Sequence, residues 1–155
     1  MHPYQQSLAL SADPASVYAA LATPEGLRAW WTQDCDVATE VGGMIRLRFG
    51  RTHKEMRIER LEPGCEVRWL CVGAHIAASR LTHKDEWVGT QIVFRLTPQD
   101  NAHTRLDFEH IGLVPSLECY DMCHDGWRFF LGSLQALLET GRGTPYAPQA
   151  AAAVQ

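Results

Sequence analysis

Residues 104–113 read TRLDFEHIGL, and the alternation within this stretch decides the fold. Leu106, Phe108 and His110 share one parity, and charged residues stand between them. Because successive side chains of a strand point to opposite faces of its sheet, the stretch predicts a strand with one apolar and one solvated face. His110 is therefore expected on the apolar face.

The same period of two extends over residues 35–113. It is interrupted by four turn-forming clusters, at residues 41–43, 50–52, 62–64 and 98–101. This spacing predicts a run of antiparallel strands with one dry face. Residues 73–85 contain alanine, serine and mixed charge without alternation, and we expect irregular or mobile structure there.

Helical patterns flank the strand region. Residues 4–10 alternate weakly, as in a strand, and two cap-and-proline signals follow at Asp13-Pro14 and Thr23-Pro24, which predict two short helices. After residue 116 the apolar period becomes 3.6, which predicts one long amphipathic helix that ends near Gly141. Its apolar stripe comprises Cys123, Trp127, Phe130, Leu131, Leu134, Leu137 and Leu138.

Together these patterns predict an α+β fold. We expect a curved antiparallel sheet of six to seven strands wrapped around the long C-terminal helix, with two short helices after the first strand. A length of 155 residues suits one domain, which we expect to span residues 1–143. Residues 144–155 are rich in alanine and are expected to form a flexible tail.

Five motifs in this order suggest a family. They are SADPASVYAAL at residues 11–21, Trp30-Trp31, WVGTQIVF at residues 87–94, TRLDFEHIGL at residues 104–113, and Gly126-Trp127. Over residues 5–141 the chain resembles the START/SRPBCC superfamily, and within it the bacterial proteins similar to the C-terminal domain of the heat-shock-protein-90 ATPase activator. The resemblance implies a helix-grip fold with a cavity between sheet and helix. Because this superfamily includes carriers, receptors, cyclases and co-chaperone domains, the fold transfers no chemistry by itself.

Composition narrows the classes of partner. The chain has 14 basic and 18 acidic side chains, a formal net charge of −4, and no basic run. Neither nucleic acid nor an anionic membrane is therefore an expected partner. The first residues lack the pattern of a signal peptide, and the longest apolar run is too short to span a bilayer, so we expect a cytoplasmic protein.

Five cysteines occur without a CxxC motif, which predicts neither a disulfide framework nor a zinc ribbon. Cys119, Cys123 and His124 are the one sequence cluster of metal-ligand types, but His124 would point away from Cys123 on a helix. No phosphate loop, dinucleotide fingerprint or nucleophile elbow is present. We therefore expect neither a metal nor a cofactor.

The aromatic residues are candidates for a ligand pocket. With five tryptophans and five phenylalanines, the chain has enough large rings to line a cavity as well as to fill a core. The sequence leaves both readings open for each ring. The predicted ligand-binding set is Trp31, Phe49, Trp69, Trp87, Phe94, Phe108, His110, Cys123 and Trp127.

Two residues are candidates for acid–base chemistry. His110 on the inner face could hold a ligand oxygen or transfer a proton, or it could be satisfied by structural hydrogen bonds. Glu86 would form an acid–base pair with His110 if it points inward, and it would be a surface carboxylate if it points outward.

Three functional hypotheses follow. The first is cofactor-free binding of a hydrophobic or aromatic small molecule between sheet and helix. The second, implied by the resemblance, is a co-chaperone-like module that interacts with a protein partner such as a chaperone, with homodimerisation as an associated expectation. The third is a cofactor-free cyclase or isomerase. We expect binding rather than catalysis.

Overall fold

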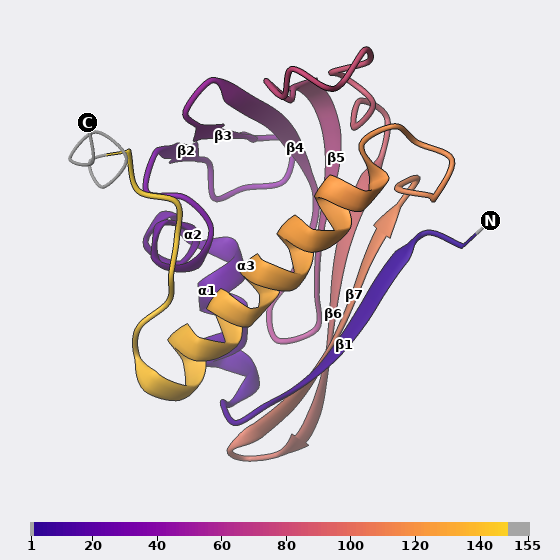
Figure 1. Cartoon of the computed structure of the whole chain (residues 1–155). Coiled ribbons are helices and arrows are strands. Elements are labelled where there is room, and N and C mark those ends of the chain that lie inside the picture. Colours follow the sequence, from indigo (N-terminus) through magenta and orange to yellow (C-terminus); the bar gives the residue numbers. More distant parts are fainter. Residues whose placement is uncertain (1, 149–155) are drawn as a thin grey trace.

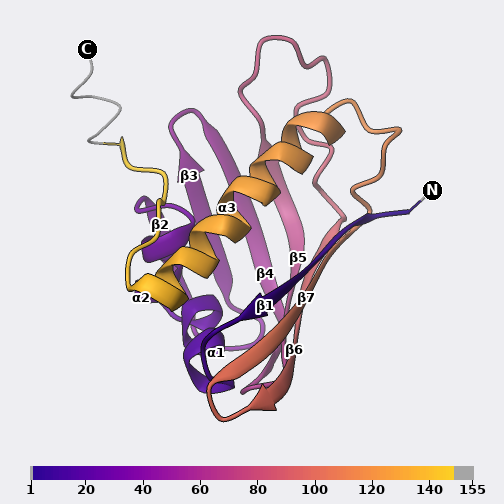
Figure 2. The same cartoon turned by 60° about the horizontal axis from the view of Figure 1, so that its bottom comes forward.

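A computed structural model describes residues 2–148, within which a seven-stranded antiparallel sheet curves around a long helix (Figure 1). The elements are β1 (Tyr4–Leu10), α1 (Pro14–Ala22), α2 (Pro24–Trp30), β2 (Cys35–Val37), β3 (Met44–Phe49), β4 (Thr52–Glu62), β5 (Glu66–His75), β6 (Gln91–Asp100), β7 (His103–Ile111) and α3 (Tyr120–Thr140). The strands are ordered β1-β7-β6-β5-β4-β3-β2. Figure 2 shows α3 across the sheet, with α1 and α2 near its C-terminal half. The predicted fold class is thereby confirmed.

The alternation of β7 is the clearest case of sequence dictating structure. Leu106, Phe108 and His110 are buried, and the intervening charged side chains face outward. The register pairs Phe94 with Phe108 and Ile92 with His110 across β6 and β7, so apolar partners meet on one face. This dry face packs against α3.

The expectation of irregular structure over residues 73–85 is wrong for its first part. β5 continues to His75, and its last residues pair with β4, with Gly73 opposite Glu55 and His75 opposite His53. The remaining segment, residues 76–90, is a loop whose apolar residues Ile76, Leu81 and Trp87 are buried. Backbone pairing and burial thus extend further than the alternation indicates.

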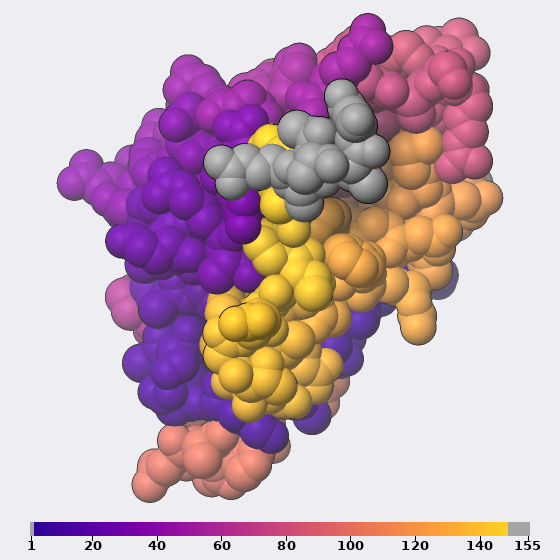
Figure 3. Space-filling view, turned by 60° about the vertical axis from the view of Figure 1, so that its left-hand side comes forward, coloured from indigo at the N-terminus to yellow at the C-terminus, as the bar shows by residue number. Residues whose placement is uncertain are grey.

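Part of the predicted tail is attached to the domain. The Thr144 N–H donates to Ser133 Oγ at 2.7 Å. The backbone of Tyr146 bonds on both sides, donating to Trp31 O and accepting from Gln33 N, each at 2.9 Å. Figure 3 shows this yellow end of the chain against the violet first third of the sequence. Residues 149–155 of the predicted tail lie outside the described residues.

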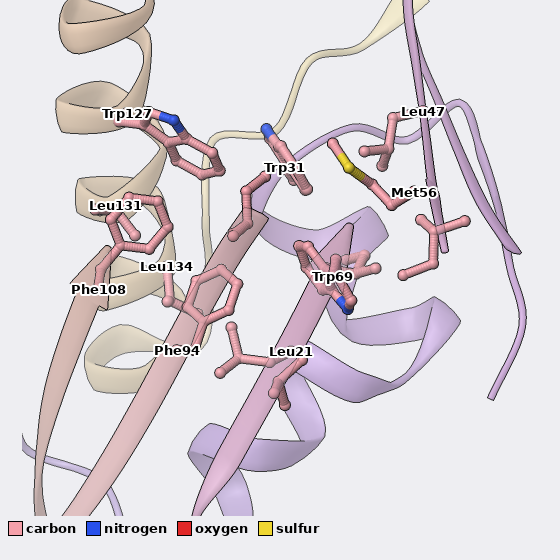
Figure 4. Packing of buried hydrophobic residues seen from close by; sticks show 14 of the residues in the cluster. Leu21, Trp31, Leu47, Met56, Trp69, Phe94, Phe108, Trp127, Leu131 and Leu134 are labelled. Atoms are coloured by element: carbon pink, nitrogen blue, oxygen red, sulfur yellow. The ribbon is translucent and has the colours of Figure 1, made fainter. Parts of the chain in front are cut away.

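All five tryptophans belong to one connected aromatic cluster. Trp31 is its centre, stacking on Trp30 at 5.4 Å and on Trp69 at 5.7 Å between ring centroids. Trp31 also contacts Trp127 at 5.2 Å, and Trp127 in turn stacks on Trp87 at 5.8 Å. Figure 4 shows Trp31, Trp69 and Trp127 converging from three different parts of the fold. The cluster therefore joins α2, the sheet and α3.

A buried hydrogen-bond network fixes α3 to β7 beside this cluster. The indole N–H of Trp127 donates to His110 Nδ1 at 3.0 Å, and His110 Nε2 lies 2.8 Å from Thr90 Oγ1. Because an indole can only donate, Nδ1 is the unprotonated nitrogen and Nε2–H is the donor. The Thr90 hydroxyl then donates to Trp87 O at 2.6 Å. When the His110 ring is neutral, both of its nitrogens, the Trp127 N–H and the Thr90 hydroxyl each have a hydrogen-bond partner.

The junction of α1 and α2 is a close backbone contact. The Thr23 hydroxyl caps α2 by accepting from the Gly26 N–H at 3.0 Å. A Cβ on Gly26 would lie 2.5 Å from Ala19 O and 2.6 Å from Ala20 Cα. Because those atoms belong to the backbone, they cannot move aside as a side chain would. Glycine at position 26 therefore permits the approach of the two helices.

The first prediction concerns the His110 network and pH. Burial, reinforced by the nearby Lys54 charge, lowers the pKa of His110 from 6.5 to about 3. Below pH 6.5 the unfolded chain therefore takes up a proton at His110 that the folded protein does not. The free energy of unfolding should fall as the pH falls, and this contribution amounts to about 2 kcal/mol between pH 7 and pH 5.

Urea unfolding from pH 7.5 to 5 tests this in the native protein, in His110→Gln and in His83→Gln, whose side chain is exposed. The His83→Gln protein should keep the dependence on pH, and His110→Gln should lose it. Ring nitrogen NMR shifts of the native protein report the same property without substitution. An imidazolium signal from His110 in folded protein at pH 5 would contradict the prediction.

The second prediction concerns Gly26. Gly26→Ala should lower the free energy of unfolding by about 1–3 kcal/mol, because the added methyl group overpacks the α1–α2 contact. Gly132→Ala is the matched control, since Gly132 is exposed in α3 and its added Cβ meets nothing within 4 Å. That substitution should stabilise the protein by about 0.5–1 kcal/mol. Denaturant unfolding shows whether each substitution lowers or raises the free energy of unfolding. Equal changes for Gly26→Ala and Gly132→Ala would contradict a close contact between α1 and α2 at Gly26.

Candidate functional site

A pocket of about 310 Å³ opens between the N-terminal half of α3 and the turn that joins β3 to β4. This volume is at the small end of the range for small-molecule sites. The loop after β5 and the segment after α3 complete the wall. The lining residues are Trp31, Phe49, Thr52, Lys54, Ile76, Trp87, Met122, Cys123, Gly126, Trp127, Phe130 and Tyr146.

Five of the nine sequence-predicted ligand-binding residues lie in this wall: Trp31, Phe49, Trp87, Cys123 and Trp127. The aromatic cluster presents one edge to the open space through three of its five tryptophans, Trp31, Trp87 and Trp127, each 2 % exposed. These rings are simultaneously part of the core and part of the wall.

The other four predicted residues, Trp69, Phe94, Phe108 and His110, lie behind the wall. Trp69 and Phe94 pack edge to face at 5.1 Å, and Phe108 contacts Trp127 at 4.4 Å between centroids. His110 packs against Trp87 at 4.5 Å. These four side chains support the lining rings and do not reach the pocket, because the tryptophans stand between.

Several lining residues were missed. Ile76 and Tyr146 reach the pocket from connecting segments, whose course no periodicity predicts. Lys54 had a usable signal, since it shares strand parity with the buried Met56 and Ile58 of β4. Parity therefore predicts an inward lysine, a rare arrangement for a charged side chain.

Lys54 is held among aromatic rings. Its Nζ lies 3.7 Å from the centroid of the Trp87 ring and 5.1 Å from that of Phe49. Burial lowers the pKa of the Lys54 amine. Within residues 2–148 the amine has no hydrogen bond or ion pair to another side chain, and its compensation comes from the faces of the two rings.

Cys123 is another polar residue of the wall, in addition to Lys54, Thr52 and Tyr146. Its sulfur accepts from the Trp87 indole N–H at 3.1 Å. The Cys119 thiol, which donates to Cys123, lowers the pKa of the Cys123 thiol together with the Lys54 charge and the Trp87 N–H, and burial opposes them. Hydrogen bonding to Cys123 correspondingly raises the pKa of Cys119. Cys119 is therefore the donor and Cys123 the acceptor of this pair, and of the two only Cys123 lines the pocket.

Glu86 is half-buried and is engaged by backbone rather than by His110. Its carboxylate accepts from the N–H groups of Glu118 and Cys119 at 3.2 and 3.0 Å, at the start of α3. Glu118 reciprocates by accepting from the N–H groups of Thr82 and His83 at 2.8 and 2.7 Å. These bonds tie the loop after β5 to the beginning of α3. The structure does not bring Glu86 and His110 together as an acid–base pair.

The described residues carry no metal cluster: among residues 2–148, no three histidine, cysteine, aspartate or glutamate side chains gather in a way that could hold an ion. None of the described helices combines the length and apolarity needed to cross a membrane. The pocket can accommodate an apolar body against aromatic walls and a polar group near Lys54 and Cys123. This arrangement suits binding of a small molecule.

Several solved structures are similar to this chain. The Aha1 dimer from Colwellia psychrerythraea is 31 % identical, with a TM-score of 0.76 over 92 % of this chain and 100 % of that chain. Protein MLL2253 from Mesorhizobium loti is 20 % identical, with a TM-score of 0.68 over 88 % and 97 %. Protein CV1439 from Chromobacterium violaceum is 24 % identical, with a TM-score of 0.63 over 89 % and 97 %. The last two show the fold alone.

No functionally curated protein gives a significant match. The model of one protein family matches residues 11–139, which is most of the chain and includes all three helices apart from the last residue of α3. Together with the relative from Colwellia, which spans nearly the whole domain, this match confirms the resemblance in the sequence. The chain belongs to the family of Activator of Hsp90 ATPase homolog 1-like proteins.

Proposed function

We propose that this protein binds an apolar or aromatic small molecule in the pocket between α3 and the β3–β4 turn. The observation that carries the proposal is the open space beside Trp31, Trp87 and Trp127, of which the last two are stacked. Apolar side chains at the rim extend this wall toward solvent, since Phe49, Met122 and Phe130 are only half-buried. A ligand would remove their exposed surface from water.

Gly126 supports the proposal. A Cβ at this position would meet no atom within 4 Å, and the residue lines the pocket from α3. Glycine in a helix costs about 1 kcal/mol relative to alanine, and no close backbone contact explains it here. A larger side chain at position 126 would extend into the pocket. The glycine therefore keeps the volume free at a cost in helix stability.

The placement of the acid–base candidates supports binding rather than turnover. Both ring nitrogens of His110 are engaged in the network with Trp127 and Thr90, and His110 does not line the pocket. Both carboxylate oxygens of Glu86 accept backbone N–H groups. A cyclase or isomerase that used His110 or Glu86 as its acid or base would need that group free to meet a substrate.

The third prediction tests the pocket with the neutral fluorescent probe N-phenyl-1-naphthylamine. The native protein should bind it, and Gly126→Leu should weaken binding by about tenfold or more, because the leucine occupies the pocket. Gly132→Leu places the same side chain on the exposed side of α3 and should bind like the native protein. Fluorescence titration gives the dissociation constants, and circular dichroism confirms folding. Equal binding of the probe by native protein and by Gly126→Leu would refute the proposal.

A second candidate function is interaction with a chaperone of the Hsp90 class, favoured by the family match and by the 31 % identical Aha1 dimer. The exposed face of α3 offers a contact, since Phe129 is 56 % exposed. An aromatic ring so exposed on a rigid helix is a suitable anchor for a protein partner. Self-association of this chain, as in the similar dimer, would use such a surface as well.

The fourth prediction separates this candidate from ligand binding. If the outer face of α3 binds the chaperone, the protein should stimulate the ATPase of an Hsp90-class chaperone, and Phe129→Ser should reduce that stimulation several-fold. Gly126→Leu, which alters only the pocket, should stimulate like the native protein. A steady-state ATPase assay measures this, and an unchanged rate with native protein at saturating concentration would exclude the candidate.

A further inference from the structure

Lys54 is the only charged side chain among the residues that line the pocket. An ammonium group carries three N–H donors. Among the described residues, none of the three has an acceptor, and the amine rests on the rings of Trp87 and Phe49. The other lysine of the chain shows the usual arrangement, since Lys84 donates to the carbonyls of Ala78 and Leu81 at 2.7 and 2.6 Å.

The acidic side chains nearest to Lys54 form hydrogen bonds with other groups. Glu55, next to Lys54 in β4, points to the opposite face, where it bonds His53 at 2.8 Å and lies against Gly73. Glu86 is engaged by the backbone at the start of α3. The side chains that raise the pKa of Lys54 against the effect of burial are the cysteines Cys123, Cys71 and Cys119. The charge of Lys54 in turn lowers the pKa of His110, which lies behind the lining tryptophans. No carboxylate of the described protein serves as its counterion.

An unpaired cation in an apolar wall is unfavourable, and cation–π contacts offset only part of the loss of hydration. A ligand carboxylate would supply the missing counterion and accept the free N–H groups. The rest of such a ligand would lie against the rings of Trp31, Trp127 and Phe130. The wall thus combines one site for an anion with a larger area for hydrocarbon.

We propose that the natural ligand is an apolar carboxylic acid, aromatic or aliphatic, whose carboxylate pairs with Lys54. This inference rests on the proposed function and narrows the ligand class. It assigns Lys54 as the residue that selects acids over neutral molecules of the same shape.

The fifth prediction compares naphthalene-1-acetate with naphthalene-1-acetamide, which has the same ring and nearly the same shape but no charge. Native protein should bind the acetate about 10- to 100-fold more tightly, as expected for hydrogen bonds to a charged group. Lys54→Met keeps the apolar stem and removes the charge, so it should bind both compounds with similar affinity. Isothermal titration calorimetry and quenching of tryptophan fluorescence measure the affinities at pH 7.

Arg51→Met is the control, because it removes one positive charge from an exposed position in the β3–β4 turn outside the pocket lining. It should retain the preference for the acetate. If native protein binds both compounds equally, or if Lys54→Met keeps the preference, the inference about Lys54 is wrong while the proposed function stands. If native protein binds neither of these compounds nor N-phenyl-1-naphthylamine, the proposed function fails and the inference fails with it.

Discussion

Packing of Trp31 against its three tryptophan neighbours, stacked on Trp30 and Trp69 and tilted against Trp127, is the interaction on which the rest of the structure depends. Trp31 follows α2 directly, Trp69 belongs to β5 and Trp127 to α3, so a single ring contacts three elements that are distant in sequence. Its backbone carbonyl also accepts from Tyr146, which brings the segment after α3 to the same place. Because aromatic rings bury large areas and prefer specific geometries, this junction sets the position of α3 relative to the sheet.

The pocket is a consequence of how this cluster ends. Toward β6 and β7 the tryptophans meet Phe94 and Phe108, and packing is complete. Toward the β3–β4 turn they meet Gly126 and a lysine, neither of which fills the remaining space. The tryptophan cluster is therefore packed against other side chains on one side and borders the pocket on the other. Rigid support from behind keeps the open side preformed, which lowers the cost of ordering on binding.

Much of the fold could be predicted because burial leaves a periodic signal. The alternation in β7 correctly placed His110 inside, and the 3.6-residue period identified α3. Irregular structure is predicted over residues 73–85 because alanine, serine and mixed charge give no alternation there, although the backbone continues the ladder with β4 as far as His75. The partners of His110 were not readable, since Thr90 and Trp127 meet it only through the tertiary packing of β6, β7 and α3. Periodicity gives the face of a side chain but not its neighbour.

His110 and Lys54 show how two basic side chains on the inner face acquire different roles. His110 is enclosed, accepts from Trp127 and donates to Thr90, so the neutral form is fully satisfied and burial holds the pKa low. Lys54 shares the cost of desolvation but has no acceptor in the described protein and borders open space. Selection for stability alone would favour an apolar residue at an inward strand position without a partner. The charge at this position is explained if its counterion arrives with the ligand, and under that proposal the ammonium group of Lys54 determines which molecules the pocket prefers.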